Sequence, residues 1–192
     1  MEKGTRKAVS MTHTAKIARS RGRHSSETSG SSIAEVELRG TEEVYLHPGQ
    51  TFASPEPSSI SMILGSCVGL FLHDRKLHIG GATHFMLPVW DGKGQASSRY
   101  GDVAMKTLLE YLHKYGSETR NVQAKVFGGA CMFTAFRDGQ GMHIGTRNVT
   151  ATLEFLRATG IPVMFQDTGG ESGRKLRIRT DTGDTTVKVV GR

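Results

Sequence analysis

Two side chains of this sequence could act as the nucleophile and the general base of a hydrolase. Cys67 follows Gly65-Ser66, where a tight backbone could expose the thiol and point amide groups outward. His84 lies seventeen positions later. A free thiol is mostly protonated at neutral pH, so it needs an imidazole that takes the proton and stabilises the thiolate. A lone cysteine is more often a small buried hydrophobic residue, and a lone histidine is more often structural, so the fold must bring this pair together.

The imidazole of such a pair needs a third group that holds it in a useful tautomer. Three hydroxyl side chains near the pair could do this, those of Ser61, Ser66 and Thr83. The residue pattern by itself leaves the choice among them open.

A β-hairpin is the element that would join the two groups. Val68, Leu70 and Leu72 alternate with other residues, and the apolar pattern resumes at Leu77 after a polar segment, 73–76. A turn at 73–76 pairs Leu72 near Leu77 and sets Cys67 opposite residues 82–84. Cross-strand neighbours lie about 5 Å apart. A shift of one residue, or a bulge at the glycines 80–81, then brings His84 beside Cys67.

The remaining pattern predicts a layered α/β (α+β) domain over residues 33–192, with mixed or antiparallel sheets flanked by helices. Residues 101–115 have helical spacing, and a second helix around Val149–Leu156 stops at Gly160. Residues 54–59 and 89–99 read as loops. Strands are predicted at 34–38, 44–46, 60–64, 122–127, 163–165, 176–178 and 187–190. Residues 1–32, rich in Ser, Arg, Lys and Gly, are predicted to be a disordered basic tail.

Charge and composition exclude several other functions. The net charge of the 192 residues is +7, but residues 33–192 hold 18 basic and 16 acidic residues, so most of the excess lies in the tail. The near-neutral body argues against a nucleic-acid surface. No signal peptide or membrane-length apolar run is visible. Two cysteines are too few for a disulfide framework, which favours a reducing, cytoplasmic setting.

The other candidate residues have structural interpretations. Cys131, beside Met132 and Phe133, is predicted to be buried. His73, His78 and His143 lack the spacing of a metal site with either cysteine. No metal or organic cofactor is expected.

A series of motifs closely resembles the chemoreceptor glutamine deamidase family, CheD. The series covers roughly positions 44–190 in order, and each glycine motif alone would be weak. It comprises Leu64-Gly65-Ser66-Cys67-Val68, Gly80-Gly81, His84-Phe85-Met86-Leu87-Pro88, Arg99-Tyr100-Gly101, Ala104-Met105, Lys125-Val126-Phe127-Gly128-Gly129-Ala130, Ile144-Gly145, Arg147-Asn148, Asp167, Gly169-Gly170 and Gly173-Arg174-Lys175.

The resemblance implies a Cys–His–Thr/Ser triad formed here by Cys67, His84 and Ser61. Ser61 stands where many members have Thr, and Ala82-Thr83 replaces the Met-Asn-like pairs that are common before the histidine. The implied fold is related in architecture to the catalytic domains of cytotoxic necrotizing factors.

The implied activity is that of a protein-glutamine glutaminase in chemotaxis, which converts glutamines on the cytoplasmic helices of methyl-accepting chemoreceptors to glutamate and releases ammonia. The alternative is a non-catalytic or dual-role protein that binds and stimulates a CheC-type phosphatase of the response regulator. In either case we expect a cytoplasmic monomer with no nucleic-acid partner and no membrane insertion.

Overall fold

The strands of the structure form two stacked sheets. The structure is a computed structural model that describes residues 41–131 and 143–191. One sheet has the order β1-β3-β8-β9 and the other the order β2-β5-β4-β6-β7. The strands are β1 (Glu42–Tyr45), β2 (Gln50–Ser54), β3 (Ser58–Leu64), β4 (Val68–Asp74), β5 (Ile79–Phe85), β6 (Val122–Gly128), β7 (Val163–Thr168), β8 (Gly173–Arg179) and β9 (Thr185–Val190).

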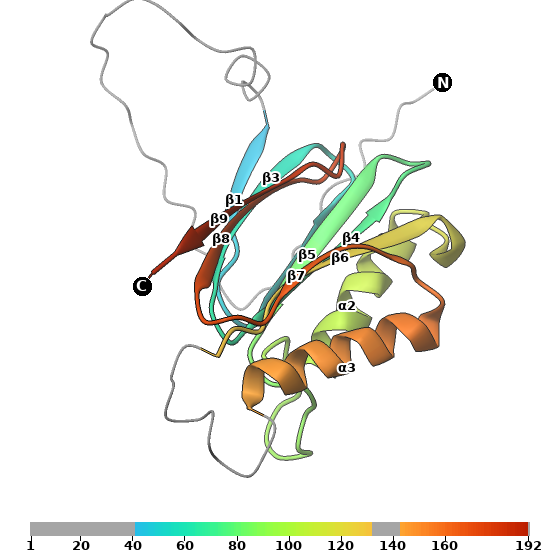
Figure 1. Cartoon of the computed structure of the whole chain (residues 1–192). Helices are drawn as coiled ribbons and strands as arrows, with labels where there is room; N and C mark the ends of the chain where they lie inside the picture. The colour runs from blue at the N-terminus through green and yellow to red at the C-terminus, as the bar shows by residue number, and fades with distance from the viewer. Residues whose placement is uncertain (1–40, 132–142, 192) are drawn as a thin grey trace, which may run out of the picture.

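Both sheets are mixed. β1 runs parallel to β3 and β6 runs parallel to β7, whereas the other neighbouring strands are antiparallel. Two helices, α2 (Gly101–Lys114) and α3 (Ile144–Thr159), cover the face of the five-stranded sheet that points away from the four-stranded one (Figure 1). A short 3-10 helix, η1 (Thr119–Asn121), leads into β6. The predicted layered α+β domain with flanking helices is therefore confirmed.

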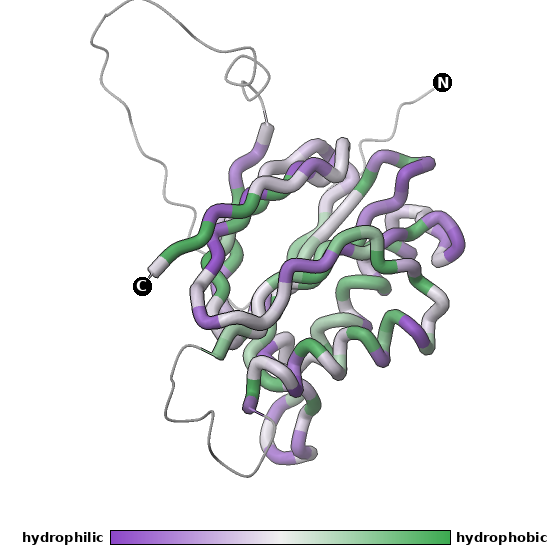
Figure 2. The backbone as a smooth tube through the Cα atoms, viewed as in Figure 1, coloured by the Kyte–Doolittle hydropathy of each residue, from purple (hydrophilic) through white to green (hydrophobic). Residues whose placement is uncertain are grey.

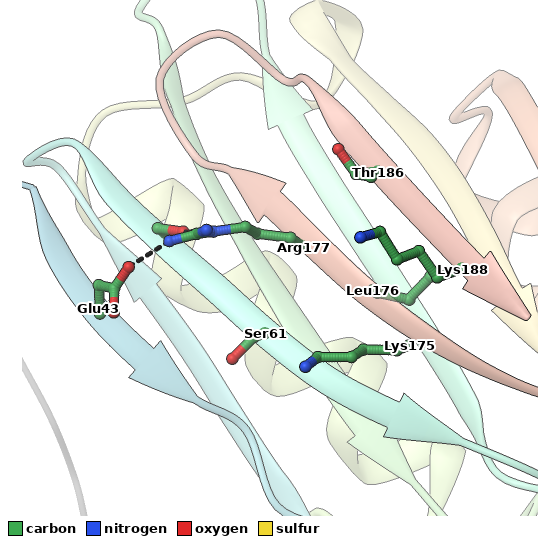
Figure 3. Close-up of a pocket in the computed structure, with 8 residues that line it drawn as sticks. Glu43, Ser61, Lys175, Leu176, Arg177, Thr186 and Lys188 are labelled. Carbon is green, nitrogen blue, oxygen red and sulfur yellow. Dashed lines mark hydrogen bonds and ion pairs between the residues drawn. The ribbon is translucent and has the colours of Figure 1, made fainter. Parts of the chain in front are cut away.

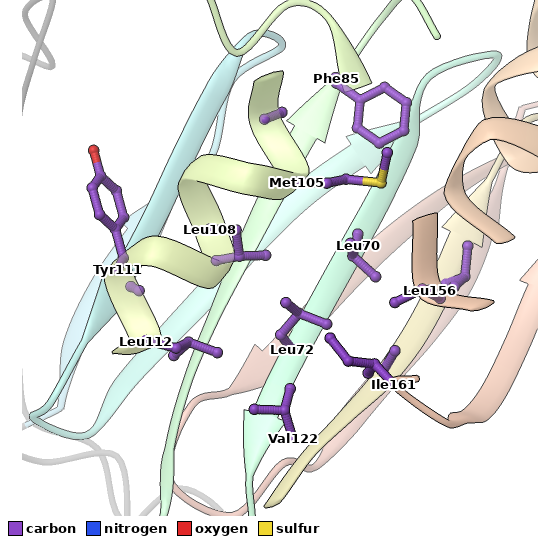
Figure 4. Close-up of a cluster of buried hydrophobic side chains, with 14 of the residues drawn as sticks. Leu70, Leu72, Phe85, Met105, Leu108, Tyr111, Leu112, Val122, Leu156 and Ile161 are labelled. Carbon is purple, nitrogen blue, oxygen red and sulfur yellow. The ribbon is translucent and has the colours of Figure 1, made fainter. Parts of the chain in front are cut away.

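Two hydrophobic clusters hold the three layers together. One cluster lies between the five-stranded sheet and the helices, and Leu70, Leu72, Met105, Leu108 and Leu156 point into it (Figure 4). The other lies between the sheets and includes Leu46, Ile60, Met62, Leu64, Phe71, Ala82, Phe127, Leu176 and Ile178. All residues of β4 and β5 are buried because these strands have a layer on both faces.

The helices follow the predicted spacing. The buried residues Ala104, Leu108 and Leu112 of α2 recur every four positions, and the buried Met105 lies beside them on the same face. Hydrophobic and hydrophilic residues also alternate along α3 (Figure 2), as expected of a helix with one face on a sheet. The predicted stop at Gly160 is a left-handed C-cap, a conformation that glycine adopts without strain.

The prediction of a loop at residues 54–59 was wrong. Residues 54–59 are not a loop throughout, since β2 extends to Ser54 and β3 starts at Ser58. Ser58 enters the strand because its N–H donates to Thr180 Oγ1 at 2.8 Å and its carbonyl accepts from Thr180 N at 3.0 Å. These bonds join segments more than 100 residues apart, so no local pattern predicts them. The predicted strand at 34–38 and the tail lie outside the described residues.

The hairpin turn was predicted two residues too early. Asp74 pairs with Ile79 and Leu72 pairs with Gly81, so the turn spans residues 75–78. The carboxylate of Asp74 accepts the N–H groups of Lys76 and Leu77 at 2.8 and 3.0 Å. Ser117 donates to its second oxygen. These bonds make Asp74 the last residue of β4 and place the turn after it.

Candidate functional site

The loop that carries Cys67 is fixed through its backbone carbonyls. Gly65, Ser66 and Cys67 connect β3 to β4, and all three carbonyls accept hydrogen bonds. The Gly65 carbonyl accepts from Ala130 N and that of Cys67 from Gly129 N, both at 2.8 Å. The Ser66 carbonyl accepts from the Asn148 side chain at 3.1 Å. The donors come from the two residues that follow β6 and from α3.

Gly128 has to be glycine for this loop to close. Its φ of +98° lies in the left-handed region, and a Cβ there would stand 2.2 Å from the carbonyl oxygen of Cys67. Any side chain would both strain the backbone and push the Cys67 peptide away. The Gly128-Gly129-Ala130 segment therefore sets the position of the nucleophile candidate.

Asn148 joins the Cys67 loop to the segment that follows His84. It is fully buried on α3, and its Nδ2 donates to the carbonyls of Ser66 at 3.1 Å and of Met86 at 2.9 Å. Its Oδ1 is buried and has no hydrogen-bond partner among the described residues. The sequence resemblance includes Asn148 but gives it no role. Its two partners lie 82 and 62 positions away, so no local pattern predicts these contacts.

His84 is a buried residue of β5 whose two ring nitrogens differ. The residue is only 2% exposed. Nδ1 lies 3.1 Å from the carbonyl oxygen of Leu46. A carbonyl can only accept, so this contact requires the proton on Nδ1 and leaves Nε2 with a free lone pair. Nε2 is buried and has no hydrogen-bond partner in the described part of the chain.

Cys67 and His84 lie in the same layer of the fold. Gly69 pairs with His84 across the hairpin, and Cys67, two residues before Gly69, is on the same side of the chain. A Cβ on Gly69 would come within 2.9 Å of Met62 and Leu64, so this side faces the four-stranded sheet. Cys67 packs against the cluster between the sheets, and His84 contacts Leu46 of that cluster. No hydrogen bond joins the thiol to Nε2.

Both groups are held in their neutral forms. Burial raises the pKa of the Cys67 thiol, although a hydrogen bond to its own backbone N–H opposes this shift. Burial lowers the pKa of His84 from its ordinary value of 6.5 and outweighs the opposite effect of the Leu46 carbonyl. At neutral pH the pair is therefore a thiol and a neutral imidazole with Nε2 free to accept a proton, rather than a thiolate–imidazolium pair.

Ser61 lies on the other side of β3. Ile60 and Met62 are fully buried in the cluster between the sheets, whereas the side chain of Ser61 lines a groove on the outer surface of the four-stranded sheet (Figure 3). The Ser61 carbonyl accepts from Leu46 N at 2.8 Å, and the Leu46 carbonyl in turn contacts His84. The described hydrogen bonds therefore link Ser61 to the imidazole through the backbone of Leu46. The predicted contact of its hydroxyl with the imidazole stays a prediction.

The other predicted residues take structural positions. Cys131 is half-buried rather than buried, and its N–H donates to the Gly170 carbonyl. His73 Nε2 lies 3.0 Å from the carbonyl oxygen of Asp181. His78 lies in the hairpin turn with a φ of +54°, and the side chain of His143 caps the N-terminus of α3. Within residues 41–131 and 143–191 no group of three His, Cys, Asp or Glu side chains could hold a metal ion. In the same ranges, the helices are too short or too polar to cross a bilayer.

The chain is similar to proteins of one family. Residues 86–189 match the family model described as "CheD chemotactic sensory transduction". The chain is 36% identical to the probable chemoreceptor glutamine deamidase CheD of Sulfurimonas denitrificans over 149 residues. These residues make up 78% of this chain and 95% of that protein. It is 41% identical to the probable chemoreceptor glutamine deamidase CheD 1 of Anaeromyxobacter dehalogenans over 149 residues, which make up 78% of this chain and 85% of that protein.

A third relative is the chemoreceptor glutamine deamidase CheD of Thermotoga maritima, 39% identical over 132 residues that cover 69% of this chain and 82% of that protein. Among solved structures, the hypothetical protein YfiH of Bacillus licheniformis has a TM-score of 0.44 and 12% identity over 70% of this chain and 67% of that one. A likeness that weak carries no conclusion about function. The identities over most of the chain, together with the family match, show that this chain belongs to the CheD family.

Proposed function

We propose that this protein deamidates glutamine side chains of chemoreceptors in chemotaxis, with Cys67 as the nucleophile and His84 as the general base and acid. The observation that carries the chemistry is the state of His84. Its Nδ1 is bound to the Leu46 carbonyl. Its Nε2 is buried in the layer that also contains the Cys67 thiol and has no partner among residues 41–131 and 143–191. Buried polar atoms are rarely left without a partner, and a catalytic role is one of the reasons for which such an atom is kept.

The first step forms a thioester. His84 Nε2 takes the thiol proton while the sulfur attacks the carboxamide carbon of the substrate glutamine. The imidazolium then gives that proton to the departing nitrogen, and ammonia leaves. The thiol must approach Nε2 for this transfer, and such hydrogen bonds commonly tighten only when substrate is bound. Because both groups are neutral at rest, His84 removes the proton during the attack.

The fixed carbonyls of the Cys67 loop support an oxyanion site. In a trans peptide the N–H points opposite to the C=O. The carbonyls of Gly65 and Ser66 point toward Ala130 and Asn148, so the N–H groups of Ser66 and Cys67 point to the opposite side. Two such donors could stabilise the negative oxygen of the tetrahedral intermediate.

Hydrolysis of the thioester completes the reaction. His84 takes a proton from water, the hydroxide attacks the thioester carbon, and the sulfur leaves and regains its proton from the imidazolium. The carboxamide and one water become a carboxylic acid and ammonia, and the acid then gives its proton to the ammonia, so the final products are a carboxylate and ammonium, without a cofactor. The reaction needs a reduced cysteine, which supports a cytoplasmic location. The predicted CheC-type phosphatase partner and the monomeric state stay predictions.

Intact-mass analysis tests the function. Purified cytoplasmic fragments of candidate chemoreceptors are incubated with the protein, and each deamidation adds about one dalton to the fragment as the cysteine hydrolase releases one ammonia. We expect both the mass gain and the ammonia with the natural chain, and neither with Cys67→Ala. Cys131→Ala is the matched control and should remain active. Undiminished ammonia release by Cys67→Ala would refute the assignment of the nucleophile.

A further inference from the structure

The outer face of the four-stranded sheet has a groove of about 450 Å³ that the proposed chemistry does not use (Figure 3). Two rows of side chains cross the strands there. One row runs from Tyr45 through Ser61 and Arg177 to Thr186. The second runs from Ile63 through Lys175 to Lys188. Most residues of both rows are exposed, so the rows form a binding surface rather than a core.

The charge of this groove is unbalanced. Lys175 lies directly opposite Lys188 in the β8–β9 pair, and like charges at such positions destabilise a sheet. Among the residues that the structure describes, neither ammonium group has an acidic partner. Arg177, the third cation, already donates to Glu43 and to Ser59 Oγ. The two lysines therefore leave positive charge available for an external anionic group.

Glu43, Ser59 and Ser61 line the β1 and β3 side of the groove, and two exposed apolar side chains flank it on the same face of the sheet. Tyr45 and Ile63 are 47% and 48% exposed, and they belong to β1 and β3, whereas the free cations belong to β8 and β9. A partner that contacts both these apolar side chains and the two lysines must present apolar side chains along one stripe and carboxylates along the next. An amphipathic acidic helix has this arrangement. Four strands about 4.8 Å apart give a face about 14 Å wide, which accommodates a helix of about 10–12 Å diameter.

One end of the groove is close along the chain to the proposed nucleophile. The row with Ile63 and Lys175 lies at the end of β3, and the chain continues from Leu64 directly into the Gly65–Cys67 loop. We propose that this groove is a docking surface for an acidic helix of the protein substrate, outside the glutamine that reacts. This inference rests on the proposed function and names the part of the substrate that the surface recognises.

The kinetic test separates docking from chemistry. The double variant Lys175→Glu/Lys188→Glu is compared with the natural chain on a helical chemoreceptor fragment and on a glutamine hexapeptide too short to reach the groove. Because two attractive charges become repulsive, we expect the KM for the fragment to rise by at least about fivefold with kcat unchanged. Turnover of the hexapeptide should not change. Added salt should raise the KM of the natural chain more than that of the variant.

The matched control is Lys106→Glu/Arg157→Glu, which makes the same change in charge at exposed positions of α2 and α3. It should leave the KM for the fragment as it is. A docking variant with an unchanged KM, or a control with an equal rise, would overturn the docking surface. Stronger binding of a single-stranded RNA than of the fragment, lost in the same variant, would also overturn it. Absence of deamidation by the natural chain would instead contradict the proposed function.

Discussion

Replacement of Asn148 by alanine should damage both stability and catalysis, because one side chain holds two segments of the site. Its Nδ2 donates to the carbonyls of Ser66 and Met86 in a fully buried position. The first carbonyl precedes the proposed nucleophile by one residue, and the second follows the proposed base by two. Asn148→Ala removes both N–H donors and leaves two part-buried carbonyls without them.

The size of the effect follows from the groups left unpaired. A fully buried carbonyl without a donor costs about 1–3 kcal/mol, so these two part-buried carbonyls cost at most about 2–6 kcal/mol. The substitution also removes the buried Oδ1, which has no partner in the part of the chain that the structure describes, and this offsets about 1–3 kcal/mol of the loss. We expect the free energy of unfolding to fall by about 2–4 kcal/mol once the small cavity is included. A domain of ordinary stability, about 5–15 kcal/mol, survives this loss.

The catalytic effect should exceed the effect on binding. Asn148 touches the backbone next to Cys67 rather than substrate, and a displacement of about 1 Å in a reacting group can cost about 100-fold in rate. We expect kcat to fall by about that factor and KM to stay within about twofold. Urea denaturation measures the stability, and the intact-mass assay with a receptor fragment measures the kinetics.

Thr152→Ala provides the matched control. Thr152 is also fully buried on α3, but its hydroxyl donates to the Asn148 carbonyl within the helix and contacts neither loop. It should lose stability with little loss of kcat. Equal losses of kcat in the two variants at temperatures where both are folded would refute the positioning role of Asn148 and leave only a general effect of stability.

Two further predictions concern the imidazole. Ser61→Ala should keep most of the activity if the Leu46 carbonyl orients His84, because alanine retains the backbone groups that link Ser61 to Leu46; a loss of 100-fold or more, the scale expected of a missing general base, would favour the hydroxyl contact instead. The depressed pKa of His84 means that the unfolded chain binds a proton there more readily, so the free energy of unfolding should fall as pH drops below 6.5, the ordinary value. Urea denaturation of the natural chain and of His84→Gln between about pH 5 and 8 should show a weaker pH dependence in the variant, and equal slopes would contradict the buried neutral imidazole.

Much of the fold is visible in the amino-acid sequence. The periodic residues of α2 and α3 predicted both helices, and the alternation around Val68–Leu72 predicted the hairpin. These predictions succeeded because burial of one face imposes a local period on the residues. The turn of the hairpin was misplaced because the side chain of Asp74 binds the backbone of the turn, and β2 was missed because polar residues fill much of it.

Part of the candidate site could also be predicted from the sequence, and part could not. The sequence identified a thiol and an imidazole as a possible pair, since the reactivity of Cys67 and His84 belongs to the side chains themselves. Only the tertiary structure decided that a backbone carbonyl, that of Leu46, contacts the imidazole, that Ser61 faces outward and that Asn148 joins the two loops. Every residue has a backbone carbonyl, so the type of a residue does not indicate whether its carbonyl contacts a side chain of the site. Which carbonyl meets which donor depends on strand register and on the packing of segments far apart in the chain.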